Sequence, residues 1–169
     1  MTPINADSLA AIHQEASRIY DLGTRSPAAI ISAESMAWIL GYGLSRQFVF
    51  DCVDDLARYG EPCLEDFIAM ALQRAAWHAA RPPGGVAPAI LTEPELPPKS
   101  EAFAGIPWLP RIVRKARAFL EGNLCDEIMY GCAGDRAFLK KFGLTLPEFL
   151  ALSQREDFDL ASIRHYLRG

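Results

Sequence analysis

The sequence predicts an all-α protein on three observations. Apolar residues recur at intervals of three and four along most of the 169-residue chain, the spacing of one face of a helix. Residues that start helices stand in front of these segments. Strand signals are nearly absent, and the run 127–130 is the one place where a strand is allowed. We expect an N-terminal helical bundle over 1–80, a proline-rich connection over 81–105, and a small C-terminal helical module over 106–169.

Four helices are predicted in the N-terminal bundle. A capping or turn-forming residue stands before each apolar run, and the preceding helix has ended before that residue. The predicted starts are, in order, Asp7 or Ser8, Ser26-Pro27, Ser45 and Pro62. Cys52 and Cys63 fall on the apolar faces of the third and fourth helices, so we expect both in the core.

Residues 81–105 contain six of the twelve prolines and show little periodicity. Such a segment reads as an extended linker or as a loop that wraps over the surface. It is long for a compact domain, which makes it the best candidate for a domain boundary.

The C-terminal module is again predicted to be helical. A first helix follows Pro107 and Pro110 and ends at Gly122, and shorter helices follow it. The expected starts of the shorter helices are Gly134 or Asp135, Thr145 with Glu148 as a capping box, and Asp159.

Composition narrows the class of protein. Half of the residues are hydrophobic and the formal net charge is −4, which argues against a dedicated nucleic-acid binder. We expect no secretory signal and no membrane span, and therefore a soluble, cytoplasmic protein whose four cysteines are reduced. Residues 1–80 have an excess of acidic side chains, whereas residues 106–169 have a slight excess of basic ones.

The helix after Pro110 carries a cluster of cations opposite its apolar face: Arg111, Arg114, Lys115 and Arg117. One interpretation is a solvated face whose long stems cover the surface. The other is a strip that binds a phosphate, a carboxylate or an acidic partner, which could be the acidic N-terminal half of this chain.

Two cysteines lie in the connector after this helix. Cys125 and Cys132 are more widely spaced than paired zinc ligands, so no metal is predicted, although a site using both with a histidine is a weaker alternative. Cys132 precedes an expected helix start and Arg136, and both features favour a thiolate. No Cys–His arrangement can be read from the sequence, and a buried, inert cysteine is the competing interpretation.

The segments PWLPRIVRKARAFLEG, YGCAGDRAFL and FGLTLPEF resemble, in order and spacing, the bacterial domain-of-unknown-function family 5069. The resemblance covers residues 106–149, or 106–169 with the last helix. It departs from the family at Ala133-Gly134, where a proline is expected, and at Cys125, where no cysteine is expected. It singles out Leu109, Pro110, Arg111, Lys115, Arg117, Gly122, Tyr130, Cys132, Asp135 and Phe138. It implies a small bacterial protein in which Arg111, Lys115, Cys132 and Asp135 share one site.

Two functional hypotheses follow. The first is a binding or assembly protein, such as an accessory subunit of a larger complex, with a protein partner or a second copy of itself. The second is a small thiol-dependent enzyme or anion-binding protein. In that case Cys132 and Asp135 would be catalytic, and Arg111, Arg114, Lys115, Arg117 and Arg136 would bind the anion. No cofactor is predicted under either hypothesis.

Overall fold

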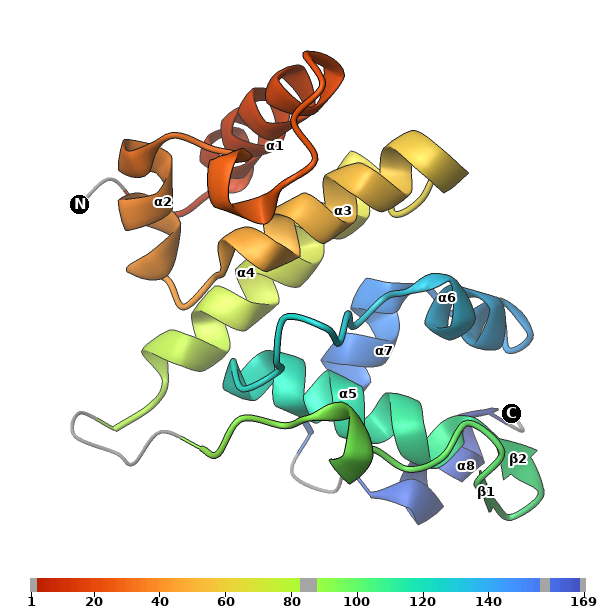
Figure 1. Ribbon diagram of the computed structural model, residues 1–169. Helices are drawn as coiled ribbons and strands as arrows, with labels where there is room; N and C mark the ends of the chain where they lie inside the picture. Colours follow the sequence, from red (N-terminus) through yellow and green to blue (C-terminus); the bar gives the residue numbers. More distant parts are fainter. Residues whose placement is uncertain (1–2, 83–87, 156–158, 168–169) are drawn as a thin grey trace. The chain divides into compact units, whose positions relative to one another are not determined.

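The computed structural model describes residues 3–82, 88–155 and 159–167, with the side chains of 164–166 excepted. The chain divides into two compact units, Met1–Gly84 and Gly85–Gly169 (Figure 1). The described residues form eight α-helices, two short 3-10 helices and one very short hairpin. The all-α prediction is therefore confirmed. None of the described helices is long and apolar enough to cross a membrane.

The first unit is built from four α-helices and one 3-10 helix. They are α1 (Ala6–Asp21), η1 (Pro27–Ala29), α2 (Ala33–Leu40), α3 (Arg46–Tyr59) and α4 (Leu64–Ala79). Helix α1 packs against both α3 and α4. At the centre of this packing, the fully buried ring of Phe67 stacks on Phe48 and touches His13.

Three helix starts in the first unit differ from the prediction. Helix α4 begins at Leu64, two residues after the predicted start at Pro62. Helix α1 is capped by Asn5 rather than Asp7 or Ser8, because the Asn5 side chain accepts from the Ser8 backbone. The single helix expected after Ser26 is η1 followed by α2. The break falls at Ser32, whose N–H donates to the Glu15 carboxylate on α1 at 2.8 Å, so a tertiary contact overrides the local pattern.

The two cysteines of the first unit differ in burial. Cys52 is fully buried, as predicted. The prediction for Cys63 is wrong, because its side chain is exposed. Cys63 is the N-cap of α4 and precedes the first helical residue, so it does not share the apolar face of that helix.

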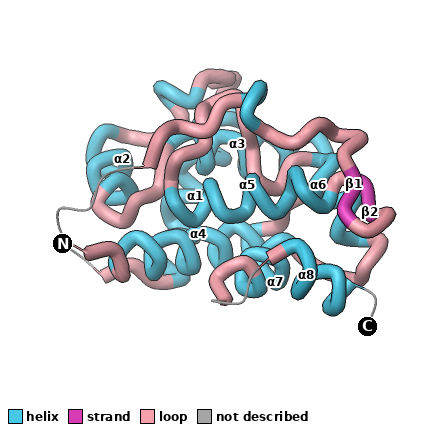
Figure 2. The backbone as a smooth tube through the Cα atoms, turned by 90° about the horizontal axis from the view of Figure 1, so that it is seen from below, coloured by secondary structure: helices cyan, strands magenta, loops and turns pink. Residues whose placement is uncertain are grey.

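The second unit is organised around α5 (Leu109–Glu121), which contacts a hairpin and two later helices (Figures 1 and 2). Its other elements are η2 (Glu93–Glu95), β1 (Ala102–Phe103), β2 (Ile106–Pro107), α6 (Ala133–Lys140), α7 (Leu146–Leu152) and α8 (Leu160–Leu167). The predicted Thr145–Glu148 capping box is present, and Asp159 caps α8 by accepting from the Ser162 N–H at 2.7 Å.

The division between the two units falls inside the proline-rich segment 81–105, and the second unit includes most of that segment. Leu91 donates its N–H to the Asn123 carbonyl at 2.6 Å and accepts from the Cys125 N–H at 3.2 Å. Leu91 and Leu96 are buried in a cluster with Ala118 and Ile128. These apolar residues, spaced among the prolines, hold the segment against the body of the unit.

The position of the strand was also mispredicted. No strand forms at 127–130. The large side chains of Ile128 and Tyr130 in this run are buried in the core of the unit. The described hairpin joins β1 to β2 through Ala104 and Gly105, which both have positive φ angles, as a tight two-residue turn requires.

Candidate functional site

The site lies in the second unit, where the start of α6 meets α5, and Asp135 is its centre. The Asp135 carboxylate is fully buried. It accepts hydrogen bonds from the Trp108 indole N–H at 2.9 Å and from the Gly131 backbone N–H at 3.0 Å. It also forms a buried ion pair with the Lys115 ammonium. The charge of Asp135 is therefore compensated by one cation and two neutral donors.

Lys115 links this carboxylate to a thiol. Its side chain is 3% exposed, and its ammonium donates to Cys132 Sγ at 3.3 Å as well as to Asp135. Cys132 is the N-cap of α6, is partly exposed, and makes no side-chain capping hydrogen bond. The sulfur therefore sits between a buried cation and the helix terminus whose first N–H groups lack intrahelical partners.

Trp108 is positioned by its backbone. It is the N-cap of α5 and has a φ of 71°, an unfavourable left-handed conformation for a bulky residue. Its N–H donates to the Glu101 carbonyl at 3.1 Å. Its ring packs so closely on Gly134 that a Cβ atom there would lie 2.5 Å from a ring carbon. The absence of a side chain at Gly134 allows the indole to reach Asp135.

The turn before α6 is fixed by its own contacts. Gly131 has a φ of 97°, and its carbonyl accepts from the Arg136 guanidinium at 2.6 Å. The buried Tyr130 hydroxyl donates to the Leu146 carbonyl at 2.8 Å. Burial, and to a lesser degree the charge of Asp135, raises the pKa of Tyr130 well above its ordinary value, so this phenol stays neutral.

The predicted site residues separate into two groups. Lys115, Cys132 and Asp135 come together, and Arg136 joins the same turn. Arg111 lies at the edge of this group: its guanidinium carbon is 5.9 Å from the centroid of the Trp108 ring, while the guanidinium pairs with Glu93 and donates to the Pro97 carbonyl at 3.0 Å.

The four cations of α5 do not form one surface. Arg111 and Lys115 are buried, Arg117 is partly buried and Arg114 is exposed. Helix α5 therefore presents neither a continuous anion-binding strip nor a fully solvated face. The helical spacing placed these four residues on one side of the helix. It does not show the acidic partners Glu93 and Asp135, which come from distant segments.

Sequence reasoning missed the parts of Trp108 and Gly131 in this site. The sequence pattern assigns neither residue to the site. Two signals were available, namely the glycine before Cys132 and the aromatic residue before the proline-led helix. Neither signal identifies Asp135 as the group that both residues bind.

Cys125 and Cys132 are both free cysteines. Burial and the neighbouring Glu127 raise the pKa of the Cys125 thiol. Among the described side chains, no group of three histidine, cysteine or acidic residues is placed to hold a metal ion.

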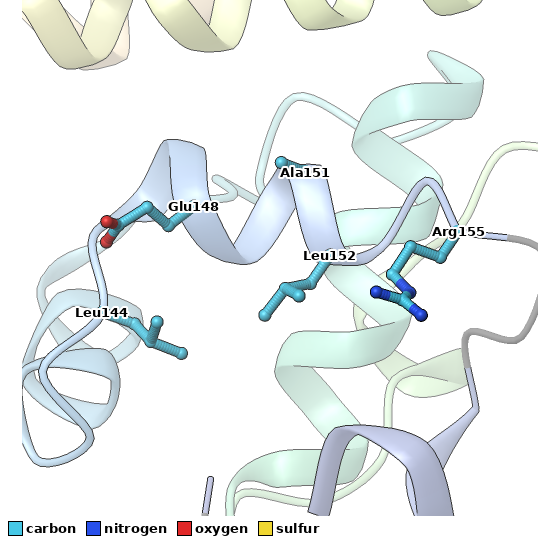
Figure 3. Close-up of a pocket in the computed structure, with 5 residues that line it drawn as sticks. All are labelled: Leu144, Glu148, Ala151, Leu152 and Arg155. Atoms are coloured by element: carbon cyan, nitrogen blue, oxygen red, sulfur yellow. The ribbon is translucent and has the colours of Figure 1, made fainter. Parts of the chain in front are cut away.

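A separate shallow hollow of about 480 Å³ lies on α7 (Figure 3). Leu144 and Leu152 point toward one another across it, and charged side chains lie at its rim. The lining residues are Leu144, Glu148, Ala151, Leu152 and Arg155.

The sequence matches no family model, no curated protein and no solved structure. The resemblance to family 5069 accordingly stays a prediction, and the geometry of the site carries the functional argument.

Proposed function

We propose that the second unit carries a reactive-thiol site in which the Cys132 thiolate forms a bond to a small anionic electrophile and displaces its leaving group. The observation that carries this proposal is the 3.3 Å contact between Lys115 Nζ and Cys132 Sγ. A thiol acts as a nucleophile in its negatively charged form, and a neighbouring ammonium group stabilises negative charge on sulfur. Partial exposure leaves the sulfur open to a small molecule.

The charges around the thiol favour an anionic reactant. Two cations, Lys115 and Arg136, and one carboxylate, Asp135, are bound to the turn and the first residues of α6. The free N–H groups at the start of a helix add a partial positive charge. With the thiolate counted, these formal charges sum to zero, so the partial positive charge of the helix start is what favours an incoming anion beside the sulfur.

Asp135 has a positioning role in this proposal. Its carboxylate anchors the Lys115 ammonium, and its bond from Gly131 fixes the turn that ends at Cys132. Without this anchor, a lysine on α5 would extend its flexible stem toward water. The reaction itself would use the sulfur and the ammonium.

Two alkylating reagents of different charge test the proposal. Iodoacetate is anionic and iodoacetamide is neutral, so the ratio of their rates reports the local charge at each thiol. We expect a higher ratio at Cys132 than at exposed Cys63 in the same sample, measured by mass spectrometry of the peptides. Equal ratios at the two cysteines would remove the anion preference from the proposal.

A second candidate function is binding of a protein partner or a second copy of the chain, as an assembly or accessory subunit. The hollow on α7, with its leucines and charged rim, favours this role. Leu152→Arg would then abolish the self-association that light scattering measures, whereas Ala137→Arg, at an exposed position of α6, would not. Identical masses for the wild-type protein and both variants would oppose self-association through this hollow.

A reducing compartment keeps a thiol such as Cys132 reduced. For this reason, and from the family resemblance, we propose the cytoplasm of a bacterium as the location of the protein.

A further inference from the structure

The end of α4 in the first unit gathers three basic side chains that the thiol site does not use. His78 follows Arg74 by four residues and thus lies one turn further along the same face of the helix. Arg81 lies just beyond the end of the helix. All three belong to the unit that is otherwise rich in acidic residues.

Arg74 is buried, and among the described residues one nitrogen of its guanidinium has no hydrogen-bond partner. The residue is 5% exposed, and the atom without a partner is Nη1. A buried guanidinium normally pairs with a carboxylate or phosphate, because an unpaired buried charge is costly. One turn away, Nδ1 of His78 is likewise buried and without a partner in the described part of the chain.

The three groups oppose one another electrostatically. Burial and then the charge of Arg81 lower the pKa of Arg74 to about 10. Burial, followed by the charges of Arg74 and Arg81, lowers the pKa of His78. The partial negative charge at the end of α4 attracts cations in its last turn, but it supplies no acceptor to Arg74 Nη1.

A close backbone approach holds His78 in place. A Cβ atom on Gly43 would lie only 2.6 Å from the His78 ring, so only glycine permits this contact. Gly43 also has a φ of 73°, which a larger residue rarely adopts. The turn after α2 therefore fixes the imidazole beside the guanidinium.

We propose that Arg74 and His78 form a binding site for a small oxyanion, with Arg81 adding positive charge at its edge. The guanidinium presents Nη1 as a donor without a partner among the described residues, and a phosphate or carboxylate oxygen matches such a donor. The imidazole supplies a further donor once it is protonated or in the matching tautomer. The site is independent of Cys132.

Thermal unfolding with added salts tests the site. At constant ionic strength, inorganic phosphate at ten times its Kd multiplies the folded-to-unfolded ratio by about 11. We expect phosphate to raise the Tm of the wild-type protein and of Arg18→Met, an exposed control on α1, and to leave Arg74→Met unchanged. Acetate is the second arm. A rise with phosphate alone assigns a phosphate group, and a rise with both salts assigns oxyanions generally.

Two results would overturn the proposal: no Tm rise with either salt, or an equal rise in Arg74→Met. An NMR titration of His78 in the wild-type protein provides a readout that does not depend on the variant folding. A bound anion must raise the pKa of this histidine, so a pKa unaffected by saturating phosphate would also reject the site.

Discussion

Lys115 on α5 donates a hydrogen bond to the sulfur of Cys132 at 3.3 Å, across the junction with the start of α6. The same ammonium is paired with buried Asp135. The contact therefore combines two roles, because the ion pair that secures the packing of α6 also places a cation beside the thiol.

Removing this cation should destabilise the second unit. Lys115→Met keeps the length of the stem but leaves Asp135 buried without its counter-charge, which typically costs about 3–5 kcal/mol. Urea denaturation should show this loss. Arg114→Met, the exposed neighbour on the same helix, is the control and should change stability by no more than about 0.5 kcal/mol.

A second substitution separates the lost pair from the lost side chain. In the Lys115→Met background, Asp135→Asn neutralises the stranded carboxylate and should recover part of the stability. Losses that simply add in the double variant would mean that Lys115 and Asp135 are not coupled in solution.

Gly134→Ala should disturb the site through Trp108. The new methyl group meets the indole at 2.5 Å, and overpacking of this kind costs about 1–3 kcal/mol. In a Trp108→Phe background the ring is smaller, so the added cost of Gly134→Ala should be smaller. Thermal unfolding of the wild-type protein, the two single variants and the double variant measures the coupling between Gly134 and Trp108. Stability losses that simply add in the double variant would contradict the contact.

The local signals predicted much of this fold. Ser45, Thr145 and Asp159 begin their helices as expected, because each cap satisfies backbone groups within a few residues. Failures arose where a distant partner decides the structure. Glu15 breaks the second predicted helix at Ser32 in this way.

The site shows the same division. The shared region of Lys115, Cys132 and Asp135 was expected from the family resemblance, and helix spacing alone does not show it. The pairing of Arg111 with Glu93 could not be foreseen, because Glu93 lies in the segment interpreted as a linker or a wrapping loop. Burial of the apolar residues around η2 decides that contact, and no local pattern encodes it.

Acid should destabilise the first unit through His13. Burial lowers the pKa of His13 below 6.5, so the folded state favours the neutral ring. The stability that this provides is present above the unfolded pKa and is lost as pH falls through the folded pKa. His78 acts in the same direction.

We therefore expect the Tm to fall between about pH 7.5 and pH 5.5, and to fall less in His13→Met. The wild-type Tm curve measured over this range is the reference. A fall of equal size in the variant would show that other groups, and not His13, cause the acid sensitivity.

The most direct test of the reactive-thiol site is the rate of iodoacetamide labelling at all four cysteines of the native protein. Exposure alone ranks Cys63 first, since it is exposed whereas Cys132 is only partly so. Partial desolvation together with the neighbouring Glu65 and Asp66 carboxylates, however, raises the pKa of Cys63. Burial and Glu127 raise the pKa of Cys125, and Cys52 is fully buried. The account predicts that Cys132 reacts fastest at neutral pH. Faster labelling of Cys63, or uniformly slow labelling of all four, would contradict it.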